Sequence, residues 1–130
     1  QLGVFHPFCI SHSSGDHGEQ EPWSFGEEVI DITRKFVNLR YQLLPYLYTM
    51  FWKYVNEGEP MLKPLVYFDQ EDIQTLYRTD EFIYGNQILV CPILEPNAVG
   101  RRIYLPKGNW YNYWTNELVE GKREFWVATK

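Results

Sequence analysis

Side chains that could react or bind a ligand are concentrated near the start of the chain. Histidine, cysteine and acidic residues recur there at close intervals, namely His6, Cys9, His12, Asp16, His17, Glu19 and Glu21. Zinc sites of the recognisable kind use tight ligand pairs such as C-x-x-C or H-E-x-x-H, and this stretch contains neither. We therefore expect no metal site.

Serine catalysis is a second chemistry to consider, because Ser11 and Ser13 flank His12. A nucleophilic serine needs a base within hydrogen-bonding reach, and proximity in the sequence does not establish that. The chain also lacks the G-x-S-x-G turn that exposes the nucleophile of many hydrolases. We expect no catalytic serine.

Carbohydrate binding fits the same stretch better. Imidazole and carboxylate groups hydrogen-bond to sugar hydroxyls, while aromatic faces cover the C–H surface of the ring. The stretch also contains the aromatic residues Phe5, Phe8, Trp23 and Phe25. Packing of these rings in a core is the alternative interpretation.

The elements that would position these residues follow from the hydrophobic pattern. Residues 3–9 are expected to form a short buried strand, and residues 10–26 a polar loop. From Glu27 onward, apolar residues recur at steps of three or four, which predicts a long amphipathic helix.

This helix has a predicted irregularity and a predicted end. Pro45 removes a backbone donor, so we expect a kink or break near Leu44. A glycine at position 58 should end the helix near Asn56. Residues 61–68 are then expected to form a second strand.

The second half of the sequence has a different pattern. Short apolar runs separated by Gly, Pro and Asn are typical of antiparallel strands and tight turns. They lie at residues 88–94, 102–105, 110–114 and 124–128. The chain is therefore expected to be α/β in its first half and all-β in its second.

Composition excludes several classes of partner. The 130 residues carry 12 Lys and Arg against 17 Asp and Glu, a net charge of −5, with no basic stripe that would attract nucleic acid. No apolar stretch reaches the roughly 20 residues that span a bilayer, so we expect no membrane partner. Cys9 and Cys91 lie in apolar runs and are expected to be buried free thiols.

Six segments, in order, resemble motifs of glycoside hydrolase family 31. Residues 5–12 (FHPFCISH) resemble its F-x-P-x-x-R-x-H signature, and residues 39–48 (LRYQLLPYLY) resemble its L-R-Y-x-L-L-P-Y-x-Y helix. The other segments are residues 21–26 (EPWSFG), 60–65 (PMLKPL), 80–93 (DEFIYGNQILVCPI) and 104–111 (YLPKGNWY).

The resemblance implies the last part of a (β/α)8 barrel followed by an antiparallel β-sandwich domain. We expect residues 1–72 to form the C-terminal portion of the barrel and residues 73–130 the N-terminal portion of the sandwich. The loop after Cys9 would then emerge at the C-terminal ends of the barrel strands, where such enzymes place their active sites.

The resemblance also implies two substrate-binding residues, His12 and Phe8. His12 matches the family histidine that hydrogen-bonds to sugar hydroxyls in the −1 subsite, and Phe8 lies in the same motif. A histidine that only caps a loop is the alternative. Ile10 occupies the position where the family usually has arginine, so an apolar side chain replaces a charged one.

Retaining glycosidases use two carboxyl groups about 5–5.5 Å apart, one as nucleophile and one as acid/base. In this family both are aspartates on earlier barrel strands. The acidic residues Asp16, Glu19, Glu21 and Asp80 match no catalytic motif of the family. We therefore expect no catalytic residue in this chain, no cofactor, and an N-terminus of the protein upstream of Gln1.

The implied activity is hydrolysis of terminal α-linked glucose from oligosaccharides. The expected partners are an oligosaccharide substrate and the upstream part of the same enzyme. α-Xyloside hydrolysis is the alternative within the family. Outside it, the sandwich could be a non-catalytic carbohydrate-binding or structural module, with a stacking platform of Trp110, Tyr111, Tyr113 and Trp114 unless these residues pack in the core.

Overall fold

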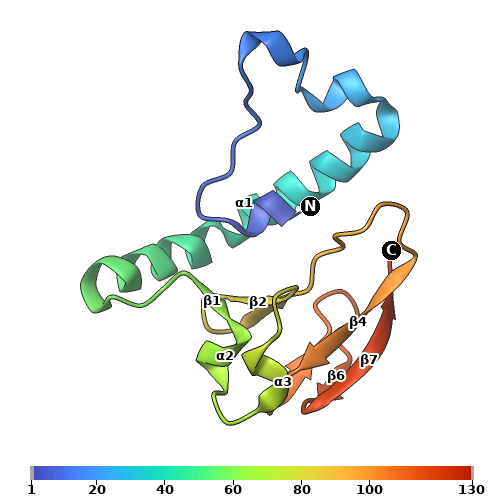
Figure 1. Cartoon of the computed structure of the whole chain (residues 1–130). Coiled ribbons are helices and arrows are strands. Elements are labelled where there is room, and N and C mark those ends of the chain that lie inside the picture. The colour runs from blue at the N-terminus through green and yellow to red at the C-terminus, as the bar shows by residue number, and fades with distance from the viewer. Residues whose placement is uncertain (1, 130) are drawn as a thin grey trace. The chain divides into compact units, whose positions relative to one another are not determined.

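The computed structural model describes residues 2–129 and divides into two compact units, Gln1–Met61 and Leu62–Lys130. Unit 1 holds the long helix, and unit 2 holds the strands (Figure 1). No helix within residues 2–129 is long and apolar enough to cross a membrane.

Unit 1 is built on helix α1, Glu27–Glu57, which confirms the predicted helix. Glu27 and Glu28 lie in its first turn, where negative charge is favourable to the helix dipole. Gly58 ends the helix in the left-handed conformation, with φ 71°, and its N–H donates to the carbonyl of Tyr54 at 3.1 Å. A glycine adopts this conformation without steric cost, which explains the stop.

Pro45 does not break α1, because the helix continues on both sides of it. Thr49, one turn later, donates its hydroxyl to the Pro45 carbonyl at 2.9 Å. The missing proline N–H would have bonded to the carbonyl of Tyr41, whose side chain is exposed. Only this one hydrogen bond is lost, and the helix continues without it.

The predicted strand over residues 3–9 is wrong. The chain forms a 3-10 helix instead, η1, Leu2–Phe5, in which His6 N–H donates to the Gly3 carbonyl at 3.1 Å. A strand is stabilised by hydrogen bonds to neighbouring strands. The carbonyls of this segment are bonded by a side chain of α1, which is described below.

Two further 3-10 helices, η2 (Gly15–His17) and η3 (Pro22–Phe25), lie in the predicted polar loop. The stretch that precedes α1, residues 2–26, contacts the helix at η1 and again at η3, just before the helix begins (Figure 1). Val4 of η1 is buried against Phe36 and Leu39, and Phe5 and Leu43 pack around them. This small core fixes only the start of the segment.

Unit 2 begins with an antiparallel sheet in the order β1-β2-β3. The strands are β1 (Leu62–Pro64), β2 (Phe82–Tyr84) and β3 (Ile88–Val90). Helices α2 (Leu65–Phe68) and α3 (Ile73–Leu76) connect β1 to β2.

Only the first part of the strand predicted over residues 61–68 is therefore confirmed, because residues 65–68 form α2. The strand ends at Pro64, which lies directly before α2 in extended conformation, with φ −64° and ψ 156°. A proline cannot donate to a strand ladder, so pairing stops there.

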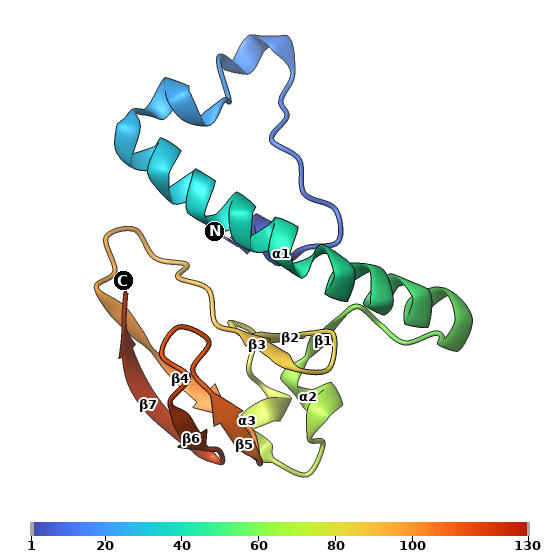
Figure 2. The same ribbon diagram turned by 180° about the vertical axis from the view of Figure 1, so that it is seen from behind.

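Two antiparallel strand pairs complete unit 2 (Figure 2). β4 (Gly100–Leu105) pairs with β7 (Arg123–Ala128), and β5 (Asn109–Tyr111) pairs with β6 (Leu118–Glu120). At the turn before β7, a Cβ on Gly121 would lie 2.0 Å from the Pro106 carbonyl oxygen, so only glycine fits. Antiparallel strands in the second half were predicted and are confirmed.

The core of unit 2 lies between α2 and the strands. Leu65, Ile83 and Tyr104 are buried together, with Leu89 and Trp110 packed against them. This cluster draws on α2, β2 and β4, so one apolar core joins the sheet to the β4–β7 pair.

Both cysteines are free thiols, as predicted. Cys9 is exposed, so its expected burial is wrong, and Cys91 is half-buried. Burial raises the pKa of the Cys91 thiol. Cys9 lies in the irregular segment after η1, which explains why its apolar neighbours do not bury it.

Candidate functional site

The residues predicted to bind sugar lie in the irregular segment between η1 and η2 of unit 1. The Phe8 side chain is 81% exposed. His12 is also exposed, as are Cys9 and Ile10 between them. The structure thus presents this motif on the surface of unit 1 rather than in a closed pocket of that unit.

Hydrogen bonds within the loop hold its second half in a folded course. Ser11 donates its hydroxyl to the Gln20 carbonyl at 3.0 Å, and Gln20 donates its side-chain amide to the His17 carbonyl at 3.2 Å. Ser24 donates to the Glu19 carboxylate at 2.8 Å. Ser11 and Glu19 therefore have structural contacts in the loop.

Arg40 of α1 hydrogen-bonds to the main chain of residues 4–7. Its guanidinium donates to the main-chain carbonyls of Val4 at 2.8 Å, His6 at 2.7 Å and Pro7 at 3.1 Å. Sequence reasoning assigned Arg40 no role. The available signal was an arginine directly after Leu39, beside the apolar face of the predicted helix.

The loop aromatics divide into one core residue and several exposed ones. Phe5 packs against the small core of unit 1. Phe8, Trp23 and Phe25 are exposed, Trp23 by 70% and Phe25 by 58%. Core packing, the alternative interpretation, is correct for Phe5 only.

Within residues 2–129, no group of three or more His, Cys, Asp or Glu side chains is arranged to hold a metal ion. Among these loop residues, Glu19 accepts a hydrogen bond from Ser24 and Glu21 accepts one from the Gln20 N–H at 3.1 Å. The structure thus supplies no arrangement for metal chemistry among the described residues.

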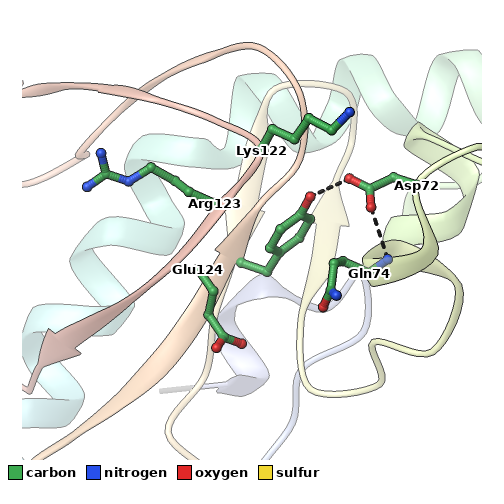
Figure 3. Close-up of a pocket in the computed structure, with 6 residues that line it drawn as sticks. Asp72, Gln74, Lys122, Arg123 and Glu124 are labelled. Carbon is green, nitrogen blue, oxygen red and sulfur yellow. Dashed lines mark hydrogen bonds between the residues drawn. The ribbon is translucent and has the colours of Figure 1, made fainter.

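Unit 2 contains an open pocket of about 360 Å³ (Figure 3). It is lined by Asp72, Gln74, Tyr104, Lys122, Arg123 and Glu124. The hydroxyl of Tyr104 and the N–H of Gln74 both donate to Asp72, the latter at 3.0 Å. Arg78 donates to Glu124 at 2.9 Å. Both carboxylates therefore bind other groups of the same unit.

These contacts set the charge state of the pocket. The hydrogen bond from Tyr104 lowers the pKa of Asp72 below its usual value. Burial, together with the bond to Asp72, raises the pKa of Tyr104 to about 12. Asp72 thus stays ionised and Tyr104 stays neutral at neutral pH. Their hydrogen bond connects the start of α3 to β4.

A buried acidic residue lies next to this region. The Glu81 carboxylate accepts a hydrogen bond from Tyr104 N–H at 2.9 Å and from Arg101 at 3.3 Å, and its side chain is 0% exposed. Its second oxygen has no hydrogen-bond partner among the described residues. Burial raises the pKa of Glu81 to about 7, although the Tyr104 N–H opposes the shift.

Arg101 is shared between two carboxylates. It bonds to the side chain of Asp80 as well as to Glu81, and it donates to the carbonyls of Asp80 at 2.8 Å and Pro92 at 2.7 Å. Asp80 also pairs with Arg78 at 3.9 Å. This network connects β4 to the residues that flank β2 and β3. It was not predicted from the sequence.

The aromatic residues around β5 divide between core and surface. Trp110 packs against the core of unit 2 and donates its indole N–H to the Pro106 carbonyl at 2.8 Å. Tyr111 is 68% exposed, and Tyr113 and Trp114 are half-exposed rings at a centroid distance of 5.2 Å. Core packing is thus correct for Trp110 but not for the other three.

Comparison with known proteins covers both parts of the chain. Residues 58–130 match the glycosyl hydrolase family 31 C-terminal domain, which is more than half of the chain. The chain belongs to glycosyl hydrolase family 31. Residues 1–50 match the TIM-barrel domain of the same family. The resemblance found in the sequence is confirmed, and so is the fold class, the end of a barrel followed by an antiparallel β domain.

Individual relatives agree with this assignment. Alpha-glucosidase 2 of Bacillus thermoamyloliquefaciens is 42% identical over 121 residues, which are 93% of this chain and 15% of that protein. Alpha-xylosidase of Saccharolobus solfataricus is 40% identical over 125 residues, or 95% of this chain and 17% of that protein.

Among solved structures, the cycloalternan-degrading enzyme from Trueperella pyogenes matches with a TM-score of 0.91 and 27% identity, over 99% of this chain and 20% of that one. The chain therefore spans only 15% to 20% of the length of these relatives.

Proposed function

We propose that this chain is the C-terminal part of the catalytic region of a retaining α-glycosidase that hydrolyses terminal α-linked glucose from oligosaccharides. The observation that carries the proposal is the match of residues 1–50 and 58–130 to consecutive family 31 domains. The 42% identity to an α-glucosidase supports the choice of glucose.

In this proposal the chain positions the sugar, and the upstream barrel performs the chemistry. His12 binds hydroxyls of the sugar in the −1 subsite, and Phe8 lies beside it in the same motif. The nucleophile and the acid/base are aspartates that lie upstream of this chain. No metal or cofactor is needed, because the two carboxyl groups form and hydrolyse the glycosyl-enzyme intermediate.

The exposed surface of unit 1 supports the same proposal. α1 leaves apolar side chains such as Tyr48, Phe51 and Trp52 at least half exposed, and Phe8 and His12 are uncovered. A surface of this kind is expected to pack against other protein. The rest of the barrel would both cover α1 and complete the pocket around His12.

α-Xyloside hydrolysis is the second candidate, because an α-xylosidase of Saccharolobus solfataricus is 40% identical to this chain. The two sugars differ at C5, which carries the C6 hydroxymethyl group in glucose and only hydrogen in xylose. The choice between them depends on residues that face this group. Comparing turnover of aryl α-glucoside and aryl α-xyloside by the whole enzyme distinguishes the two candidates.

Complementation of the chain with its upstream part tests the proposal. We expect the purified chain alone to leave an aryl α-glucoside intact, and co-expression with the upstream fragment to produce turnover. Matched co-expression with His12→Ala should give much lower turnover. Activity of the isolated chain that His12→Ala abolishes would instead place the catalytic centre inside these 130 residues.

A further inference from the structure

Arg40 connects the middle of α1 to the segment that leads into the proposed sugar site. Its Nη1 donates to the Val4 and His6 carbonyls at 2.8 and 2.7 Å, and its Nη2 donates to the Pro7 carbonyl at 3.1 Å. These partners lie between 33 and 36 residues away in the sequence. One side chain thus fixes the course of a distant stretch of main chain.

The position of these bonds matters because they are made at the edge of the packed part of the segment. Core packing holds Val4 and Phe5, but the side chains from Pro7 to His12 are exposed. Pro7 is the residue directly before Phe8. The Arg40 bond to its carbonyl is therefore made where the segment leaves the core and enters the proposed site.

The geometry also requires arginine in particular. A guanidinium is planar and presents its N–H groups in a rigid fork, so one side chain can serve several carbonyls in a fixed arrangement. A lysine ammonium has a single nitrogen on a flexible stem and cannot reproduce that fork. Hydrogen bonds from a charged donor are also stronger than neutral ones.

We infer that Arg40 is a positioning residue for substrate: it holds the main chain at Pro7 so that Phe8 and His12 meet the sugar in one geometry. The inference rests on the proposed function of His12. Arg40 itself need not touch the substrate. Small misplacements of binding groups reduce catalysis strongly, by about 100-fold for 1 Å.

The test uses the whole enzyme that contains this chain and a matched pair of arginines on α1. Arg40→Lys keeps the positive charge but loses the planar set of N–H donors. Arg34→Lys is the control, because Arg34 is exposed and pairs only with Asp31 at 2.5 Å among the contacts that the structure shows for it. We expect Arg40→Lys to lower kcat/KM for an aryl α-glucoside by about 10-fold to 100-fold, mainly through kcat. Arg34→Lys should change it less than about twofold.

Two further measurements separate positioning from general stability. Hydrogen exchange of the amides in residues 5–12 should accelerate in Arg40→Lys, while the Tm of the enzyme changes little. Added guanidinium ion should restore part of the activity of Arg40→Ala, because it can occupy the vacated site. A variant that has merely unfolded would not be rescued in this way.

Equal kinetics for Arg40→Lys and Arg34→Lys would overturn the inference. So would a loss of activity in Arg40→Ala that follows the unfolded fraction and resists guanidinium. If the wild-type enzyme does not cleave the glucoside, the proposed function fails. In that case unchanged exchange over residues 5–12 in Arg40→Lys would still show that the arginine does not hold the segment.

Discussion

The two units of the chain differ in how completely they enclose their most buried side chains. In unit 2, Leu65 and Ile83 are 0% and 1% exposed and are buried together with Tyr104, although this unit also has exposed apolar residues such as Tyr77 and Val99. In unit 1, α1 leaves large apolar residues at the surface: Ile32, Val37, Tyr41, Leu44, Tyr48, Phe51, Trp52, Tyr54 and Val55. The unit that contains the proposed site is thus the one whose helix lacks a full set of packing partners within it.

The polar groups show the same contrast. Unit 2 buries the carboxylate of Glu81 and surrounds it with Arg101 and the Tyr104 N–H. Unit 1 leaves His12 and Phe8 in solvent. Unit 2 thus holds a buried charge network within itself, whereas a fragment of a barrel presents a site that other strands must complete.

The largest expected effect tests the contrast in packing. Leu65→Ala should destabilise unit 2 by about 2–5 kcal/mol, because it removes a fully buried side chain and leaves a cavity. Leu44→Ala on α1 is the matched control, since Leu44 is 41% exposed, and it should cost less than about 1 kcal/mol. Urea unfolding of the chain, with hydrogen exchange to resolve the units, measures both. Similar losses for the two variants would remove the distinction between the units.

A smaller effect tests the buried acid of unit 2. Burial raises the pKa of Glu81 to about 7 in the folded protein, above its ordinary value of 4.5. The folded state therefore binds more protons between these pH values, so the free energy of unfolding should fall as pH rises from about 4.5 to about 7. The shift corresponds to roughly 3 kcal/mol in total.

Glu81→Gln serves as the control for this pH dependence. Glutamine cannot ionise, so the fall in stability between about pH 4.5 and pH 7 should shrink in the variant while other titrating groups contribute equally to both proteins. Denaturant titrations of unit 2 across this range give the comparison. Parallel stability curves for wild type and Glu81→Gln would show that Glu81 does not titrate there.

The sequence predicted elements whose signals are local. Periodicity identified α1, and Gly58 marked its end, because a left-handed stop has a local residue requirement. The antiparallel strands of the second half were predicted from short apolar runs. The strand expected over residues 3–9 failed, because a strand depends on partners elsewhere in the chain and Arg40 bonds to its carbonyls instead.

The site was predicted by resemblance more than by physical pattern. His12 and Phe8 were selected because they match a motif, and their roles stay predictions. Arg40 and the Arg101–Glu81 pair were missed because their partners lie far away in the sequence, Val4 in one case and Asp80 and Glu81 in the other. Contacts of this kind leave no periodic signal, so only the folded chain reveals them.

The most direct test of the account is the kinetic effect of His12→Ala in the whole enzyme, compared with His17→Ala. His17 is exposed in the same loop but lies outside the motif, so it is a matched control. We predict that His12→Ala lowers kcat/KM for an aryl α-glucoside by the equivalent of about 2–4 kcal/mol, as expected for a contact that strengthens in the transition state, while His17→Ala has little effect. A His12→Ala enzyme within twofold of wild type, or an equal loss in His17→Ala, would contradict the account.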